Sequence, residues 1–394
     1  MLKRTEEGEP MHWLMIETGS NQPYIFGTSK QRLQVAASAA IWQLGYEWVT
    51  EAIDAAAREL AAKSPVWIGT AGMQAPDHSG SHTAPGNVSR GSLDEWAEKD
   101  GLTGGDAPII ILHVVQASGK AELLVPDMET GRRIIRDITL RALESGSDID
   151  VWGAISEETL APSSSLADIA RIRKATSAAL QERRYLRTNP VVRHPRLPFH
   201  QPCAYTGMPA VEWKPEVRGG EPVARGARAS FLFGQASNAR KRMIDAMLLH
   251  ADMGFSEAGT PTGVETRELK DAIVGLRDLS DGVTGDWVGV LHADGNGIGA
   301  VFSRFNDPVF LGEFAGDAAG VVGKLGIISH QLEDITWTAL RNTITDLVAR
   351  NRESRGLRNA VLPILVGGDD IVAVVTGDIG LDFAETLSDR KSVV

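Results

Sequence analysis

The segment from Val361 to Val375 constrains the fold of this chain most strongly, because it places Gly-Gly-Asp-Asp between two short apolar runs. Glycine followed by aspartate between two apolar segments is typical of a tight β-hairpin. Such a hairpin would hold Asp369 and Asp370 next to each other at its tip. Because like charges repel, a fixed pair of carboxylates is costly unless a divalent cation or a positive side chain lies close by. The segment therefore predicts a hairpin and a candidate cation site.

A second acidic position follows another apolar run. The residues from Trp287 to Ala293 predict a strand, and Asp294 comes directly after it. A helix-compatible segment up to Phe305 comes next, and its glycine-rich start would let backbone N–H groups approach phosphate oxygens. We expect seven residues of the two elements to bind a nucleotide: Gly295, Asn296, Gly297, Ile298, Gly299, Gly367 and Gly368.

The three aspartates together indicate metal-assisted phosphoryl transfer. Carboxylates at a strand end and on a neighbouring hairpin can hold two Mg²⁺ roughly 3.5–4 Å apart. Hard oxygen ligands select Mg²⁺ or Mn²⁺. We expect Asp294 to bridge both ions, Asp369 to share them and Asp370 to complete the ligand shell, so these are the candidate catalytic and metal-binding residues.

Other interpretations of the same residues exist. The spacing Gly295-x-Gly297-x-x-Ala300 fits a loose dinucleotide-binding fingerprint, but an aspartate directly before it would repel a pyrophosphate. A calcium-binding EF-hand loop starting at Asp294 would need a glutamate twelve positions along, where the chain has Phe305. The simplest alternatives are a polar turn without ligand and an ordinary solvated hairpin tip.

Asp294 with its glycine element, together with Gly367-Gly-Asp-Asp370, resembles the second palm domain of the large subunit of type III CRISPR effector complexes. That palm is shared with nucleotidyl cyclases and GGDEF-type diguanylate cyclases, and better-known members of the family convert ATP to cyclic oligoadenylates. The resemblance implies a nucleotidyltransferase of antiviral defence that binds ATP and Mg²⁺ or Mn²⁺. It also implies other CRISPR-type subunits as partners, with guide RNA reached through them. A non-catalytic nucleotide-binding scaffold and a stand-alone diguanylate-cyclase-like enzyme remain alternatives.

The N-terminal part predicts a second, degenerate palm. Its residues indicate the order strand, helix, β-hairpin, helix, strand, which is a ferredoxin-like pattern. The predicted hairpin tip carries Ser118-Gly119 where the C-terminal copy has two aspartates, and the first strand ends in Glu17-Thr18-Gly19. This copy lacks the residues for the same metal site, so we expect it to be structural. The predicted fold class is α+β, with two ferredoxin-like palm domains.

The predicted domains are a degenerate palm over 1–160 with a flexible insertion at 71–108, a helical linker over 161–275, and the second palm over 276–394. No strand-length apolar segment follows a helix predicted near Leu381, so the second palm is expected to be truncated. The linker contains Cys203, His194 and His200, and a metal-free remnant of a zinc element is favoured because structural zinc sites generally take four ligands.

A basic helix is predicted from Leu166 to Leu186, and solvated helix surface is favoured over a phosphate- or partner-binding stripe. Composition adds further limits. The net charge of −11 argues against non-specific binding of nucleic acid by the chain's own surface. One cysteine excludes an intrachain disulfide and fits a reducing compartment. No apolar run approaches the ~20 residues of a membrane helix, so a soluble, cytoplasmic protein without a membrane partner is expected.

Overall fold

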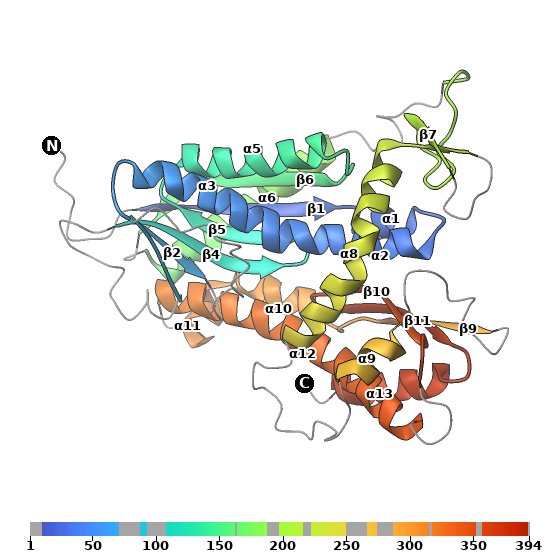
Figure 1. The fold of residues 1–394 in the computed structure, drawn as a ribbon. Helices are drawn as coiled ribbons and strands as arrows, with labels where there is room; N and C mark the ends of the chain where they lie inside the picture. Colours follow the sequence, from blue (N-terminus) through green and yellow to red (C-terminus); the bar gives the residue numbers. More distant parts are fainter. Residues whose placement is uncertain are drawn as a thin grey trace. The chain divides into compact units, whose positions relative to one another are not determined.

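The computed structural model describes ten ranges of the 394 residues, and the structural statements below concern these ranges: 10–70, 87–92, 108–161, 164–186, 197–215, 222–249, 266–273, 287–314, 317–351 and 357–392. The chain forms two compact units that alternate along the sequence (Figure 1). Unit 1 consists of Met1–Ser20, Ile41–Arg193 and Gly297–His330. Unit 2 consists of Asn21–Ala40, His194–Asn296 and Gln331–Val394.

The chain is a mixture of helices and strands, as the predicted α+β class requires. Up to residue 186 the elements are β1 (Met11–Gly19), α1 (Asn21–Phe26), α2 (Gln31–Gln43), the π-helix η1 (Leu44–Trp48), α3 (Val49–Ala61), β2 (Val66–Thr70), β3 (Val88–Ser92), β4 (Ile109–Ala117), β5 (Lys120–Val125), α5 (Met128–Glu144), β6 (Asp150–Leu160) and α6 (Leu166–Leu186). Thereafter they are β7 (Glu212–Lys214), β8 (Val223–Arg225), α8 (Ala227–Leu249), α9 (Thr266–Ala272), β9 (Val288–Ala293), α10 (Ile298–Arg304), α11 (Pro308–Phe314), α12 (Ala318–Asn351), β10 (Val361–Gly367), β11 (Asp370–Thr376) and α13 (Gly380–Ser392).

Unit 1 contains a six-stranded sheet in the order β3-β2-β4-β5-β1-β6. The four strands β4, β5, β1 and β6 pair antiparallel, and this confirms the ferredoxin-like pattern predicted for the N-terminal part. Two further strands, β2 and β3, were missed: β2 runs parallel to β4 and to β3. Because β3 is part of the predicted insertion at 71–108, that insertion is not wholly irregular, and its residues 71–86 and 93–107 lie outside the described ranges.

At Gly45 the helical segment after α2 approaches the backbone of a strand closely. A Cβ atom built on this residue would lie 2.0 Å from the carbonyl oxygen of Ala117 at the end of β4, so no larger residue fits. The helix widens to a π-helical turn, η1, at this point. Such π-helical turns are rare and occur mostly as single turns within α-helices. Here the turn accommodates the tip of the β4–β5 hairpin.

Helices cover both faces of this sheet. Helices α3 and α5 pack against each other and lie on one face (Figure 1). On the other face, Trp13 and Leu124 share a core cluster with residues of α6, α10, α11 and the start of α12. The prediction that α6 presents a solvated basic surface is wrong for Arg173, which is buried because it pairs with Glu122 of β5 at 2.8 Å.

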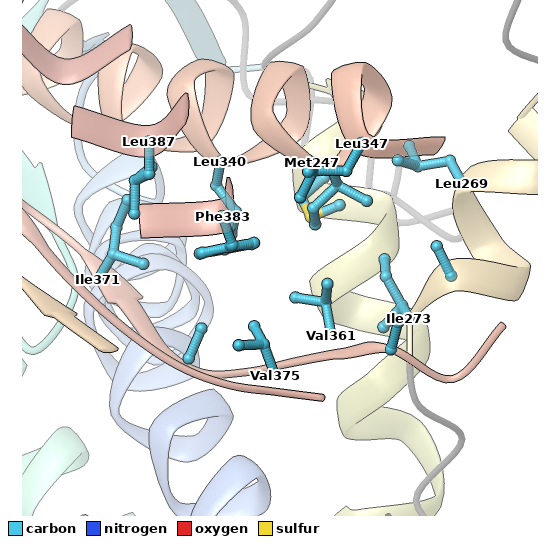
Figure 2. Packing of buried hydrophobic residues seen from close by; sticks show 14 of the residues in the cluster. Met247, Leu269, Ile273, Leu340, Leu347, Val361, Ile371, Val375, Phe383 and Leu387 are labelled. Atoms are coloured by element: carbon cyan, nitrogen blue, oxygen red, sulfur yellow. The ribbon is translucent and has the colours of Figure 1, made fainter. Parts of the chain in front are cut away.

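Unit 2 contains a three-stranded antiparallel sheet in the order β10-β11-β9. The predicted hairpin from Val361 to Val375 and the predicted strand before Asp294 are both confirmed. Side chains from α12 and α13 pack on this sheet, with Leu340, Leu347 and Phe383 against Val361 and others of its apolar side chains (Figure 2). The order of β9, α12, β10, β11 and α13 repeats the first five elements of the ferredoxin-like pattern of unit 1.

Among the described residues, β9 has a neighbouring strand on one side only. Its counterpart in unit 1, β1, is paired on both sides and largely buried. Along β9, Val288 and Val290 are 51% and 71% exposed, and Trp287 just before it is also exposed. An apolar strand that no described strand pairs with on its outer edge can act as a template for pairing with another chain.

We therefore expect the chain to self-associate at micromolar concentrations, and Val290→Lys to reduce this association by placing a charge on the free edge. Sedimentation velocity at several concentrations measures the effect. Val309→Lys is the matched control, because Val309 is similarly exposed, at 69%, but lies in helix α11. Equal effects of the two substitutions would show that β9 is not the association site.

The segment between the two palms is small and partly described. Helix α8 begins at Ala227 and ends at Leu249. Cys203 is buried, and its Sγ accepts a hydrogen bond from the Tyr205 N–H at 3.5 Å. His194 lies outside the described ranges. No described helix combines the length and the apolar character that crossing a bilayer requires.

Candidate functional site

The register of the unit 2 sheet places Asp294 and Asp370 together. Ala293, the last residue of β9, pairs with Ile371 of β11. The next position outward is Asp294 on one strand and Asp370 on the other, and directly opposed residues of an antiparallel pair have Cβ atoms about 4.5–5.5 Å apart. The structure thus brings two of the three predicted aspartates to one point.

The third aspartate occupies the hairpin turn. Gly367 pairs with Asp370, so Gly368 and Asp369 form the two-residue connection. Gly368 has φ 59°, which is the left-handed region that a II′ turn requires at its first central residue. Asp370, and not Asp369, is therefore the cross-strand neighbour of Asp294. The roles expected for the two carboxylates in metal binding remain predictions.

The environment of Asp370 disfavours its charged form. Burial raises the pKa of this carboxyl, and so do the hydrogen bond with Asp294 and the negative charges of Asp294 and Asp369. His292 partly offsets this effect. One carboxyl oxygen of Asp370, Oδ1, is buried and accepts no hydrogen bond of good geometry. Burial of this oxygen penalises the charged carboxylate, so the position favours a positively charged partner.

His292 is a neighbour that sequence reasoning missed. Its Nε2 atom lies 3.4 Å from Oδ1 of Asp370, which makes an ion pair only when the imidazole is protonated. His292 precedes Asp294 by two residues, so the two side chains share one face of the strand. That spacing was the available signal, but its meaning depends on the register with β11.

A side chain of helix α12 holds the turn between β10 and β11 by a hydrogen bond. The buried Thr336 hydroxyl lies 2.6 Å from the carbonyl oxygen of Gly368 and 2.9 Å from that of Leu332. A hydroxyl has one proton to donate, and the shorter contact indicates that Gly368 receives the larger share. The carbonyl of the turn is thereby tied to a helix of the same unit.

Thr336→Val is expected to lower the free energy of unfolding of unit 2 by about 1 kcal/mol, because the isosteric side chain leaves the Gly368 carbonyl without its donor. It should also reduce any metal-dependent activity of the hairpin, since the turn would be less fixed. Denaturant unfolding and turnover measure the two effects. Thr343→Val is the matched control, because its hydroxyl donates only to Ala339 of the same helix. Equal losses in both variants would contradict a role of Thr336 at the turn.

The glycine element is divided between the units. Gly295 and Asn296 belong to unit 2, whereas Gly297 and the two residues after it, Ile298 and Gly299, belong to unit 1. Gly297 has φ 83° and precedes α10, so glycine is required there for conformational reasons. A Cβ atom at Gly299 would meet nothing within 4 Å, so packing does not explain that glycine. Phosphate binding by this element remains a prediction.

The corresponding point of unit 1 carries an ion pair. Glu17 of β1 is opposite Lys120, the first residue of the second hairpin strand, in the same register positions as Asp294 and Asp370. The Lys120 Nζ lies 3.4 Å from a carboxyl oxygen of Glu17. In unit 1 the charge of the carboxylate is thus neutralised by the lysine opposite it. In unit 2 both of these positions carry a carboxylate.

The donor set fits a hard cation. Within the described ranges, no group of three or more His, Cys, Asp or Glu side chains is arranged so that it could hold a metal ion. Mg²⁺, however, is usually bound by one or two carboxylates together with substrate phosphates and water, not by an all-protein cage. Asp294 and Asp370 supply such a pair, and Asp369 is adjacent. Metal binding by the three aspartates remains a prediction.

No protein-family model matches this chain, and no curated protein matches it either. Solved structures of Csm1, the large subunit of type III CRISPR complexes, are similar to it, and this is the family that the motifs indicated. The apo Csm1–Csm4 cassette matches with 13% identity over 96% of this chain and 47% of that chain, with a TM-score of 0.45. Csm1 of T. onnurineus matches with 12% identity over 99% and 47%, with a TM-score of 0.44.

The chain therefore spans about half the length of the solved chains that it matches. Because the identity and the TM-scores are this low, the comparison supports no residue of the site.

Proposed function

We propose that unit 2 binds a nucleoside triphosphate and a divalent cation at Asp294, Asp369 and Asp370, and transfers the nucleotidyl group to a ribose hydroxyl. One observation carries the proposal. Two carboxylates, Asp294 and Asp370, face each other on neighbouring strands, at the position where unit 1 has the Glu17–Lys120 ion pair. Such an arrangement costs stability unless it serves a bound ligand.

The chain's own residues would act by position and charge. Asp294 and Asp370 hold negative charge at the end of the sheet, and the turn that carries Asp369 is tied to Thr336. Bound Mg²⁺ or Mn²⁺ would supply charge neutralisation of the triphosphate and a lower pKa for the attacking hydroxyl. In the reaction, a 3′-hydroxyl oxygen forms a bond to the α-phosphorus, pyrophosphate leaves, and the hydroxyl proton passes to solvent.

The nucleotide, the product and the partners are proposed from the resemblance of the motifs to the type III CRISPR family. We propose ATP as the nucleotide, a cyclic or oligomeric adenylate as the product, and a role in antiviral defence. We also propose that the chain assembles with other CRISPR-type subunits, and that these, rather than this acidic chain, contact guide RNA. The net charge of −11 disfavours direct binding of RNA by this chain and therefore favours contact through the partner subunits.

Incubation of the purified chain with labelled ATP and Mn²⁺, followed by separation and mass analysis of the products, tests the proposal. Release of pyrophosphate with cyclic or linear oligoadenylates supports it. Metal-dependent ATP binding without product would instead identify the competing function, a nucleotide-binding scaffold. A cyclic dinucleotide made from GTP would identify a diguanylate-cyclase-like enzyme. Absence of both binding and turnover would contradict all three.

A further inference from the structure

Four side chains of unit 2 gather around one aromatic ring of helix α8 and are called the Phe233 cluster: Arg32, Tyr205, Arg225 and Phe233. The rings of Phe233 and Tyr205 pack edge to face, with their centres 4.9 Å apart. The guanidinium carbon of Arg225 lies 3.9 Å from the centre of the Phe233 ring, and that of Arg32 lies 4.4 Å from it. Each cation is attracted to the ring, but the two like charges repel each other. The cluster therefore favours an anion close by.

Arg225 places a buried positive charge in this cluster. It is the last residue of β8 and is only 9% exposed, and its Nε atom donates to no acceptor in the described ranges. Glu212 lies opposite on β7, but its two carboxyl oxygens contact the hydroxyl of Ser230 and, at 3.0 Å, the Nζ of Lys214. A buried guanidinium is costly unless hydrogen bonds to an anion compensate it. Arg225 is therefore a position at which a bound anion would be stabilising.

Tyr205 offers a second hydrogen-bond donor at the same place. Its side chain is buried, and its hydroxyl has no partner in the part of the chain that the structure describes, although a buried tyrosine usually finds one. The centre of its ring lies 5.7 Å from the guanidinium of Arg225 and 6.0 Å from Nζ of Lys30. The N–H of Ser29 donates to the Tyr205 carbonyl oxygen at 3.0 Å, which holds the loop before α2 beside this residue.

We infer that the Phe233 cluster binds a phosphate group, with Arg225 and Tyr205 as its hydrogen-bond donors. The fork of a guanidinium matches two phosphate oxygens, and several cations match a charge that can approach −2. Arg32 and Phe233 are half-buried and Lys30 is exposed, so a ligand can approach from solvent. The inference goes beyond the proposed function, because the cluster contains none of the three aspartates and requires no divalent cation.

Calorimetric titration of the chain with inorganic phosphate, in buffer freed of divalent cations, tests the inference. Arg225→Met keeps an apolar stem on Phe233 but removes the charge, so the affinity for phosphate should fall by about tenfold or more. Tyr205→Phe removes only the hydroxyl. It should weaken binding by about threefold to tenfold without lowering the free energy of unfolding, since that hydroxyl has no partner to lose among the described residues. Lys241→Gln is the control, because it removes an exposed charge further along α8 and should leave binding unchanged.

Adenosine monophosphate and a short 5′-phosphorylated oligonucleotide, titrated in the same buffer, identify the source of the phosphate group. Tighter binding of the oligonucleotide would support a nucleic-acid end as the ligand, and equal binding of all three compounds would support a small phosphate compound. Binding of acetate as tight as that of phosphate would overturn the assignment in favour of a carboxylate. Absence of binding by all three phosphate compounds, or unchanged binding in both Arg225→Met and Tyr205→Phe, would also overturn it. Absence of ATP turnover with Mn²⁺ would count against the proposed function alone.

Discussion

Asp294→Asn is expected to reduce metal-dependent turnover of ATP by about three orders of magnitude or more, as is usual for a group that acts as one unit with its neighbours. The substitution keeps the size of the side chain but removes one of the two opposed carboxylates. It should also lower the pKa of Asp370, because Asp294 is one cause of its rise. Steady-state kinetics with Mn²⁺ and labelled ATP measure the loss.

Two further variants separate loss of chemistry from loss of fold. Asp370→Lys would give unit 2 the acid–base arrangement that Glu17 and Lys120 have in unit 1. It should abolish turnover while the metal-free protein unfolds no more easily than before. Asp378→Asn removes an exposed carboxylate beyond the opposite end of β11 and should leave turnover unchanged. Full activity in Asp370→Lys would refute the assigned site.

Glu122→Gln is expected to lower the free energy of unfolding of unit 1 by about 3–5 kcal/mol, because it leaves the buried Arg173 without its counter-charge. Replacing both partners, as Glu122→Leu with Arg173→Met, should restore much of this loss, since a buried ion pair contributes little relative to apolar residues. Denaturant unfolding followed by hydrogen exchange in β1 and β5 measures unit 1 separately from unit 2.

The control is Glu17→Gln, which removes a more exposed ion pair of the same sheet and should cost about 1 kcal/mol or less. A loss in Glu122→Gln no larger than this would show that the buried ion pair matters no more to unit 1 than the exposed one. The buried pair of Glu122 and Arg173 should also make the stability of unit 1 sensitive to acid. Because the pKa of Glu122 is lowered to about 2 in the fold, its contribution to the free energy of unfolding is present above its ordinary pKa and is lost as pH falls toward 2. The double variant should show a weaker dependence in that range.

The local features of the candidate site could be predicted because they depend on neighbours in sequence. A glycine followed by aspartates between apolar runs determines a hairpin, and an apolar run ending in aspartate determines where β9 stops. The pairing of Asp294 with Asp370 instead of Asp369 depends on the register between β9 and β11. Register is a property of two segments about 75 residues apart, and nothing local to either one specifies it.

The partners of the site could not be predicted for a similar reason. Thr336 is one threonine among several in a long helix, and its contact with Gly368 arises only when α12 packs on the hairpin. Arg173 was assigned to a solvated surface because it stands among other basic residues. A signal did exist in β5, where Glu122 lies between buried apolar residues and therefore requires a buried cation.

Strands β2 and β3 were missed because local composition does not reveal a strand that is stabilised by pairing with a distant segment. Val88–Ser92 has serine, arginine and glycine at three successive positions and no apolar alternation, so the sequence indicated a loop. Parallel pairing with β2 supplies its backbone hydrogen bonds, and this pairing is non-local. The ferredoxin-like core was predictable because its strands are apolar and its hairpins are short.

Titration of the chain with Mn²⁺ in the presence of a non-hydrolysable ATP analogue, followed by electron paramagnetic resonance, is the decisive test of metal and nucleotide binding by the three aspartates. We expect bound Mn²⁺ that depends on the nucleotide, and loss of that signal in both Asp294→Asn and Asp370→Lys but not in Asp378→Asn. Binding of Mn²⁺ and nucleotide that is equally strong in all three variants would contradict this expectation.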